Sequence, residues 1–340
     1  MAAVQDIGVD LGTSSVVIYG KNKGVILNEP AVIAFDRESR TILAVGEEAY
    51  RMIGRTPGSI VAMRPLKTGA VEDGEMASAM LRYFTAKVAG KHLLGGPRVI
   101  FSTPEGVNET ERVNMAGSFF EAGARKVQYV ERPIAAALGA GLPIMQAYGQ
   151  MVCDIGGNDT EIAVTSLGQM TIRKRSKVGG DAFDDAIIKY IRRKHNLLIG
   201  EVTAEMLKKH IGSAIPRSDR FFMKVTGRNL ISGLPKVMSI YSDEITEAMD
   251  EPLQNLMEDI NDVLEHTPNE LVTDIYESNI WLTGGGARIS GLCDAVSTYL
   301  NVNCRLAENP QECVARGCGL VLENWAEYGR LVNNRHHRGG

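Results

Sequence analysis

One unit occurs twice in this chain of 340 residues, once near the start and once near the middle. VDLGTSSVVIY begins at Val9, and CDIGGNDTEIAV begins at Cys153. Each copy has the pattern of a strand that ends in aspartate, a glycine turn and a second strand. A weak internal repeat of this kind predicts two similar α/β halves that face each other. The expected fold class is therefore α/β with a duplicated architecture.

Further strand and helix signals agree with two α/β halves. The expected strands are short, β-branched and bounded by Gly, Asn or Pro, and cover residues 7–11, 16–19, 25–27, 31–35, 99–102, 126–130, 151–155, 161–165, 170–174, 222–226 and 279–283. The expected helices cover residues 75–88, 182–195, 204–211 and 242–265, and a small-residue helix begins at Pro133. No low-complexity linker separates the halves, and only the tail NNRHHRGG is expected to be disordered.

Asn108 marks the start of one further helix. With Glu111 three residues later it forms the pattern of an N-cap and its partner. We expect this helix to bury one face that carries apolar side chains, namely Val113, Ala116, Phe119 and Phe120.

Composition excludes several classes of protein. The net charge is −4 without long blocks of one sign, which argues against a nucleic-acid binder with a basic face. The five cysteines form no C-x-x-C pair and indicate free thiols in a reducing compartment. The N-terminal segment lacks a secretory signal, and no apolar run reaches the roughly 18 residues of a membrane span. We expect a cytoplasmic, soluble protein.

The two repeated turns suggest phosphate chemistry. Gly12, followed by Thr13 and Ser14, gives a tight turn whose backbone N–H groups can point at phosphate oxygens. Asp10 has no donor to offer a phosphate, so it is expected to orient water around Mg²⁺, and Asp154 repeats this arrangement. Two such turns, one per half, could hold a triphosphate and its metal.

A third glycine turn lies in LTGGGARISGL, which begins at Leu282. Three glycines stand between an expected buried strand and a helix N-terminus, where phosphate or ribose can approach closely. Any one of the three turns alone is more often an ordinary hairpin. Their order, each after a strand, favours a nucleotide site.

At this point the sequence resembles the MreB family of bacterial actin-like proteins over nearly its whole length, and more distantly actin, sugar kinases and heat-shock chaperone ATPases. The matching blocks include DIGVDLGTSS, GVILNEPAVIAF, IAAALGAGLP, GGDAFDDAIIKYIRRKHNLLIGE, LTGGGARISGL and CVARGCG. The resemblance implies an actin-like ATPase fold of two ribonuclease-H-like halves around a nucleotide cleft. It implies four subdomains: IA at 1–32, 66–145 and 315–335; IB at 33–65; IIA at 146–180 and 245–314; IIB at 181–244; and a disordered tail at 336–340.

The resemblance also implies bound ATP or ADP with Mg²⁺. Carried over residue by residue, the expected nucleotide contacts are Gly12, Thr13, Ser14, Gly156, Gly157, Asn158, Glu205, Met206, Leu207, Lys208, Gly284, Gly285, Gly286 and Ala287. Asp10 and Asp154 would hold Mg²⁺ through water. Spacing alone also allows Glu205 and Lys208 to be a solvated surface pair.

Three positions depart from the family pattern. Arg132 stands before Pro133, where the family has glutamate, and it cannot orient water as a carboxylate does. It could pair with the γ-phosphate, or form a salt bridge with Glu131 or another neighbour. In the second turn the family's Gly-Gly-Gly-Thr-Thr becomes Gly-Gly-Asn158-Asp159-Thr160, and Asp159 adds negative charge near the expected phosphate. Lys67-Thr68 replaces Lys-Asp.

These departures leave the residues expected to bind the nucleotide in place, but they put the hydrolysis of ATP in doubt. One hypothesis is that ATP is bound but hydrolysed slowly or not at all, because Arg132 replaces the carboxylate. The rival is that Asp159, Thr160 or Glu161 positions the water. The candidate catalytic residues are Arg132, Glu131, Asp159 and Thr160. Neutral drift in a working ATPase also stays open.

The family resemblance implies homopolymer filaments that organise cell-wall synthesis and cell shape at the inner face of the membrane. Leu93 and Leu94, beside Lys91 and His92, either insert into lipid or pack under their loop. Other implied partners are membrane proteins of the cell-wall elongation machinery and MreB paralogues. A sugar or acetate kinase, a chaperone ATPase and a plasmid-segregating actin share the fold. They fit less well, because the chain lacks an acceptor motif and length for a further domain, and because the blocks match MreB.

Overall fold

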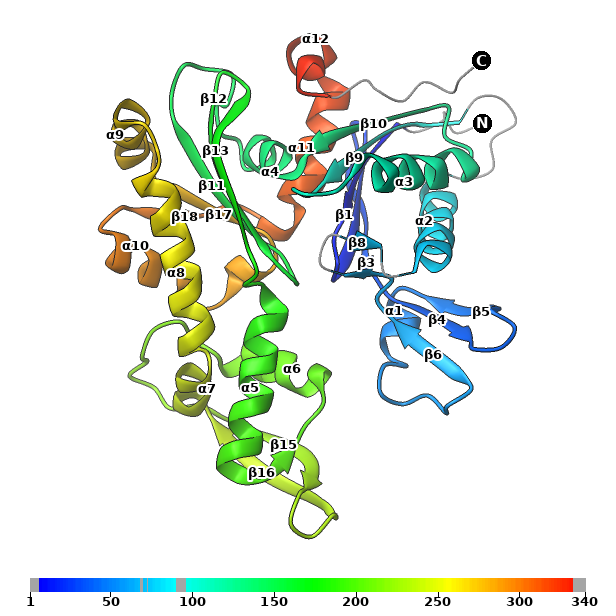
Figure 1. Ribbon diagram of the computed structural model, residues 1–340, viewed down its shortest axis with the longest axis vertical. Helices are drawn as coiled ribbons and strands as arrows, with labels where there is room; N and C mark the ends of the chain where they lie inside the picture. The colour runs from blue at the N-terminus through cyan, green and yellow to red at the C-terminus, as the bar shows by residue number, and fades with distance from the viewer. Residues whose placement is uncertain (1–5, 68–69, 72, 90–95, 333–340) are drawn as a thin grey trace. The chain divides into compact units, whose positions relative to one another are not determined.

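The computed structural model describes residues 6–67, 70–71, 73–89 and 96–332 of the chain (Figure 1). Two compact units divide it. The first comprises Met1–Tyr148, Thr165–Met170 and Gln311–Gly340, and the second comprises Gly149–Val164 and Thr171–Pro310. Leu93, Leu94, Thr68 and the tail lie outside the described residues. The division into four subdomains stays a prediction.

The first unit is built on a five-stranded sheet in the order β10-β9-β1-β2-β3. Its strands are β1 (Ile7–Leu11), β2 (Ser15–Gly20), β3 (Gly24–Pro30), β9 (Arg98–Thr103) and β10 (Lys126–Glu131). β1, β2 and β3 form an antiparallel meander, whereas β9 and β10 run parallel to β1. The carboxyl ends of β1, β9 and β10 therefore meet at one edge, which is where the first glycine turn lies.

Helices cover both faces of this sheet, as Figure 1 shows. They are α2 (Gly74–Ala89) and α3 (Glu109–Glu121) on one face, and α4 (Arg132–Gly139) and α11 (Cys313–Glu323) on the other. Ile7 and Val9 share a buried cluster with α2 and α3. Gly8 faces α11, because a Cβ there would lie 2.6 Å from the Gly319 nitrogen. Successive side chains of β1 point to opposite faces of the sheet, so α2 and α3 pack on one face and α11 packs on the other.

The rest of the first unit consists of small elements. A second sheet has the order β5-β4-β6. The elements are β4 (Ile33–Asp36), β5 (Ile42–Val45), α1 (Glu47–Tyr50), β6 (Ile60–Met63), β7 (Leu66–Lys67), β8 (Ala70–Val71), α12 (Trp325–Tyr328) and η3 (Gly329–Leu331).

The second unit repeats the first. Its five-stranded sheet has the order β13-β12-β11-β17-β18. The strands are β11 (Gln150–Ile155), β12 (Thr160–Ser166), β13 (Gln169–Ser176), β17 (Ile280–Thr283) and β18 (Cys304–Leu306). The tip of the β12–β13 hairpin, Thr165–Met170, belongs to the first unit. In each sheet the strand that comes first in the chain, β1 or β11, lies in the middle of the order. The next two strands of the chain lie on one side of it, and two strands that run parallel to it lie on the other side. The predicted duplication is confirmed.

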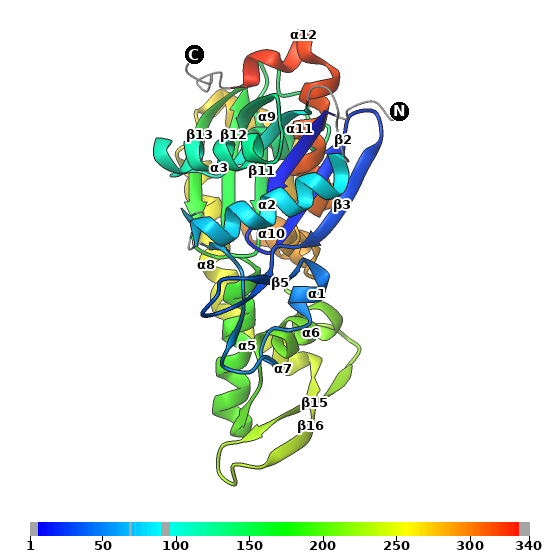
Figure 2. The ribbon, with the colours of Figure 1, turned by 90° about the vertical axis from the view of Figure 1, so that its right-hand side faces the viewer.

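Helices and a small sheet complete the second unit. They are α5 (Gly180–His195), β14 (Leu197–Leu198), α6 (Glu201–Ile211), β15 (Phe222–Asn229), β16 (Pro235–Tyr241), α7 (Ser242–Ala248), α8 (Asp250–Glu265), α9 (Asn269–Ser278), η1 (Gly286–Arg288), α10 (Leu292–Leu300) and η2 (Pro310–Glu312). Within this unit, the β15–β16 hairpin and α9 lie at opposite ends (Figures 1 and 2).

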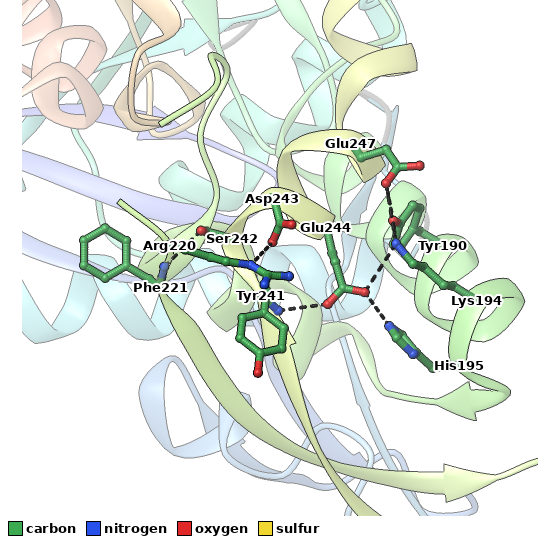
Figure 3. Close-up of polar contacts among 10 residues, drawn as sticks. All are labelled: Tyr190, Lys194, His195, Arg220, Phe221, Tyr241, Ser242, Asp243, Glu244 and Glu247. Carbon is green, nitrogen blue, oxygen red and sulfur yellow. Dashed lines mark hydrogen bonds and ion pairs between the residues drawn. The ribbon is translucent and has the colours of Figure 1, made fainter. Parts of the chain in front are cut away.

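A polar network ties the end of α5 to the start of α7 (Figure 3). Glu244, which is buried, accepts a hydrogen bond from the Tyr241 backbone N–H at 3.0 Å and so caps α7. The same carboxylate lies 2.6 Å from His195 Nε2, and Lys194 Nζ lies 3.5 Å from it. The network fixes the small sheet and α7 onto α5.

Two expectations about elements need correction. The single helix over 242–265 is wrong: α7 ends at Ala248 and α8 begins at Asp250. The capping box of Asn108 and Glu111 is confirmed, yet Val113 is exposed, and Met115 takes a buried position on α3. The sequence did not predict strands β5, β6, β7, β8, β14, β16 and β18 or helices α1, α9, α11 and α12. Among the described residues, no helix is long and apolar enough to cross a membrane.

Candidate functional site: two glycine turns

The first turn joins β1 to β2. The Gly12 backbone N–H donates to the Ser15 carbonyl at 3.0 Å, and a Cβ on Gly12 would lie 2.7 Å from that oxygen. Only glycine therefore allows this closure. In the part of the chain that the structure describes, no acceptor meets the backbone N–H groups of Thr13 and Ser14. The turn thus presents two unused donors, which is the arrangement that binds anions.

Asp10 stands at the end of β1, beside the turn. Its register neighbours on β9 place Ser102 next to it, and Ser102 Oγ donates to Asp10 Oδ1 at 2.9 Å. Burial raises the pKa of Asp10, while Arg132 and the Ser102 hydroxyl act in the opposite direction. A desolvated carboxylate of this kind is stabilised by additional positive charge.

Arg132 supplies part of that charge. It is the first residue of α4, it is buried, and its Nη2 donates to the Leu11 carbonyl at 3.2 Å. Its guanidinium also attracts the Asp10 carboxylate. Arg132 is therefore directed at the strand that carries the first turn. Glu131, the other member of this candidate pair, is the N-cap residue of α4.

The second turn joins β11 to β12 and repeats the first. The Gly156 N–H donates to the Asp159 carbonyl at 2.8 Å, and Thr283 Oγ1 on β17 donates to Asp154 Oδ1 at 2.8 Å. Within the described ranges, the backbone N–H groups of Gly157 and Asn158 have no acceptor in the chain. Both units therefore combine a hydroxyl-bonded aspartate with a turn of unused donors.

Backbone hydrogen bonds join the second turn to the start of α5. Gly180 N–H donates to the Gly156 carbonyl at 2.9 Å, and Asp181 N–H donates to the Gly157 carbonyl at 2.7 Å. The helix start thus fixes the carbonyl side of the turn, and the N–H side stays open for a ligand.

Asp159 does not leave a bare negative charge beside the turn. It is 4% exposed and pairs with Arg175 on β13, whose Nε lies 2.7 Å from Asp159 Oδ2. The Thr160 hydroxyl is fully buried and donates to the Val178 carbonyl at 2.6 Å. Both side chains are thus held by their own unit, which disfavours them as positioners of water. Their catalytic roles stay predictions.

The third glycine turn follows β17. Gly284 has φ +82°, and its N–H donates to the Pro310 carbonyl at 2.8 Å. A Cβ on Gly284 would lie 2.3 Å from the Ile155 carbonyl, so this loop packs directly against the end of β11. The exposed Gly285 has open space where a side chain would stand. The expected helix N-terminus here is wrong, because residues 286–288 form only η1 and α10 begins at Leu292.

Helix α6 holds the expected adenosine contacts. Lys208 is buried, and its Nζ lies 2.8 Å from Asp184 Oδ2 and 2.7 Å from the Gly180 carbonyl oxygen. Glu205 pairs with Lys209 at 2.7 Å, so Glu205 and Lys208 are not a solvated surface pair. Met206 is exposed, whereas Leu207 is fully buried in the core. Lys208 thus links α6 to the start of α5, and through it to the second turn.

Comparison with known proteins identifies the family of this chain. The family model described as MreB/Mbl protein matches residues 4–330. The chain belongs to the MreB/Mbl family. It is 43% identical to the cell shape-determining protein Mbl of Bacillus subtilis (strain 168), over 94% of this chain and 96% of that one. It is also 43% identical to the cell shape-determining protein MreB of Escherichia coli (strain K12), over 94% and 93%.

Solved structures confirm the fold expected for an MreB/Mbl protein. The crystal structure of MreB 5 of Spiroplasma citri bound to AMPPNP matches with a TM-score of 0.91 and 33% identity, covering 97% of this chain and 99% of that one. The MamK double helical filament matches with a TM-score of 0.77 and 19% identity, covering 94% and 98%. The second likeness shows the fold alone, and the actin-like class is established.

Several residues of the candidate site were not anticipated from the sequence. Ser102 and Thr283 bond the two aspartates, and each follows from the parallel register once the strand order is known. Asp184 and Arg175 are the buried partners of Lys208 and Asp159. No local pattern identifies these two, because each pairs with a residue on another element.

Proposed function

We propose that this MreB/Mbl chain binds ATP or ADP with Mg²⁺ and assembles into filaments. In the cell, these filaments would organise cell-wall synthesis and cell shape at the inner face of the membrane. One observation carries the proposal: each unit has a glycine turn with unused backbone donors beside a hydroxyl-bonded aspartate. Two copies of an anion-binding turn suit a polyphosphate. The Spiroplasma relatives, which were crystallised with AMPPNP and with ADP, support the choice of nucleotide.

The residues present fit that ligand. The N–H groups of Thr13, Ser14, Gly157 and Asn158 would receive the phosphates, and the open loop at residues 284–287 with Glu205 would receive the adenosine. Asp10, whose pKa burial raises, would favour a nearby cation, and so would the buried Asp154. Mg²⁺ bound through water at these carboxylates would offset the negative charge of the phosphates.

Nucleotide binding is tested with Gly12→Ala. The added methyl group meets the Ser15 carbonyl and opens the turn, so we expect at least a tenfold loss of affinity for Mg-ATP in a titration. Gly58→Ala is the matched control, because nothing lies within 4 Å of a Cβ there. Equal affinity in the Gly12 variant and the control would refute the phosphate role of this turn.

We further propose that hydrolysis is slow, because Arg132 stands where the family has a carboxylate. Its guanidinium is directed at Leu11 and Asp10 and offers no base to a water molecule. Phosphate release from Mg-ATP should be low in the wild type and higher in Arg132→Glu. Arg132→Met removes the charge without adding a group that can orient water, and should not restore release. Brisk release by the wild type would show that another residue positions the water.

Two ends of the second unit support self-assembly. The β15–β16 hairpin carries Lys224, Arg228 and Lys236 and no acidic residue, and Ile231 at its tip is 81% exposed. At the opposite end of that unit, α9 carries three acidic residues and an exposed aromatic: Glu270, Asp274, Glu277 and Tyr276 (Figures 1 and 2). Complementary patches at opposite ends permit a head-to-tail contact, which extends into open filaments.

Pelleting with Mg-ATP tests this contact. The double variant Ile231→Ser, Leu234→Ser removes the exposed apolar tip and should abolish pelleting while nucleotide affinity is unchanged. Val113→Ser removes an exposed apolar side chain from α3, in the first unit, and should pellet normally. Normal pelleting of the hairpin variant would exclude the hairpin from the filament contact.

The membrane role rests on Leu93 and Leu94, which lie outside the described residues. We expect the chain to sediment with vesicles that contain anionic lipid, and Leu93→Ser with Leu94→Ser to reduce this binding. Binding that is unaffected by both substitutions would place the membrane contact elsewhere. Contacts with elongation-machinery proteins and with paralogues are part of the same proposal, by family membership.

A further inference from the structure

Two thiols of the second unit lie side by side at the edge of its main sheet. Cys293 is on α10, and Cys304 begins β18, which pairs with β17 through Ile280. The Cys304 backbone N–H donates to Ser297 Oγ at 2.9 Å. Ser297 is one helical turn after Cys293, so both residues lie on the face of α10 that meets β18. Both side chains pack against the same buried cluster of the second unit, so this placement brings the two thiols next to each other.

The proximity of the two thiols makes them unequal. The neighbouring Cys304 thiol lowers the pKa of Cys293 despite partial burial and the nearby Asp294. The Cys293 thiol, together with burial, raises the pKa of Cys304. Cys293 is therefore the sulfur that becomes a thiolate first, and the thiolate is the reactive form.

Accessibility separates this pair from the other cysteines. Cys293 and Cys304 are each half-buried, so a small molecule can reach them. Cys153, Cys313 and Cys318 are buried, and burial raises the pKa of Cys153 and of Cys318. Two adjacent, partly accessible thiols with one activated sulfur have the features of an oxidisable pair.

We propose that Cys293 and Cys304 form a redox-active dithiol that a hydroperoxide oxidises to a disulfide within one chain. The Cys293 thiolate attacks the peroxide: an S–O bond forms, the O–O bond breaks, and the leaving hydroxide takes a proton to become water. Cys304 then loses its proton and attacks the Cys293 sulfur. The S–S bond forms, the S–O bond breaks, and a second water leaves. Both sulfurs together give two electrons to the peroxide.

The disulfide would join α10 to β18. Helix α10 follows the glycine loop at residues 284–287, so the bond would fix the element next to that loop. This modification site is independent of the proposed nucleotide binding and assembly. Its test therefore uses the folded chain without nucleotide.

The experiment is hydrogen peroxide treatment of the reduced full chain, followed by intact mass measurement and non-reducing peptide mapping. We expect a mass loss of two hydrogen atoms, a linked peptide containing Cys293 and Cys304, and reversal by dithiothreitol. Circular dichroism before and after treatment shows that the fold is kept. Cys153→Ala is the matched control and should still form the bond.

Single variants separate the roles of the two sulfurs. In Cys304→Ser, a sulfenic acid should accumulate on Cys293 and be trapped by dimedone. In Cys293→Ser, Cys304 should stay a thiol. The proposal is overturned if folded, peroxide-treated protein yields no linked peptide, if links form only between chains, or if Cys293→Ser loses two hydrogen atoms as the wild type does.

Discussion

Substitution of Lys208 tests whether its buried ion pair with Asp184 stabilises the second unit next to the glycine turn. The Lys208 side chain is 8% exposed, and its ammonium group donates to Asp184 and to the Gly180 carbonyl. In Lys208→Met the stem is kept and the charge is lost, so Asp184 is left as a buried, unpaired carboxylate. Breaking a buried pair in this way costs about 3–5 kcal/mol of unfolding free energy at neutral pH.

The same substitution should depend on pH in a defined direction. Burial raises the pKa of Asp184 to about 6, although Lys208 lowers it in part. Because this folded pKa is above the unfolded value of 3.8, the stability it contributes at low pH is lost as the pH rises through about 6. In Lys208→Met the pKa of Asp184 is higher still, because the cation that lowers it is gone. Near pH 5, Asp184 is then protonated, and the cost of Lys208→Met should fall to about 1–2 kcal/mol for the lost hydrogen bonds.

Urea unfolding of both proteins at about pH 5 and pH 7.5 gives these differences, provided that the m-value is unchanged. Adding Asp184→Asn to Lys208→Met should recover most of the loss at the higher pH. Glu205→Gln, which removes the exposed pair with Lys209, is the control and should change stability by less than about 0.5 kcal/mol. A cost for Lys208→Met that is the same at both pH values would refute the assignment of a buried, ionised Asp184.

Three further substitutions test the frame around the site. Gly317→Ala places a methyl group 1.9 Å from a carbonyl of α4 and should destabilise by about 3 kcal/mol in thermal unfolding, whereas Gly117→Ala on α3 meets nothing and should stabilise slightly. Arg175→Met leaves Asp159 buried without its cation and should cost about 3 kcal/mol in urea unfolding; a change below about 1 kcal/mol would contradict the pairing. Glu244→Ala removes the α7 cap shown in Figure 3 and should cost about 2 kcal/mol, and an unchanged midpoint would show that the network is dispensable.

Local chemistry predicted the parts of this molecule that depend on short spacing. The repeated strand, aspartate and glycine turn gave the duplicated sheets, and Asn108 with Glu111 gave a capping box. The break between α7 and α8 was missed, although Pro252 carried the signal. Proline is accommodated in the first turn of a helix, so its position indicates a start near Asp250.

The features of the candidate site that the sequence did not predict depend on contacts between elements that are far apart in the chain. Spacing placed Lys208 beside Glu205, but the fold gives it Asp184 on α5 instead. Asp159 looked like an unfavourable charge until Arg175 was seen across the hairpin. Such pairs are set by the packing of helices and strands and have no fixed separation in the sequence. The sequence therefore predicted the turns of the candidate site better than the side chains that hold them.

The most direct test of the central claim is high-speed pelleting of the pure chain with and without Mg-ATP, with phosphate release measured in the same samples. The proposed function predicts that the chain pellets as filaments only when nucleotide is present, with little phosphate released. Pelleting that is indifferent to nucleotide, or no saturable binding of Mg-ATP, would contradict it.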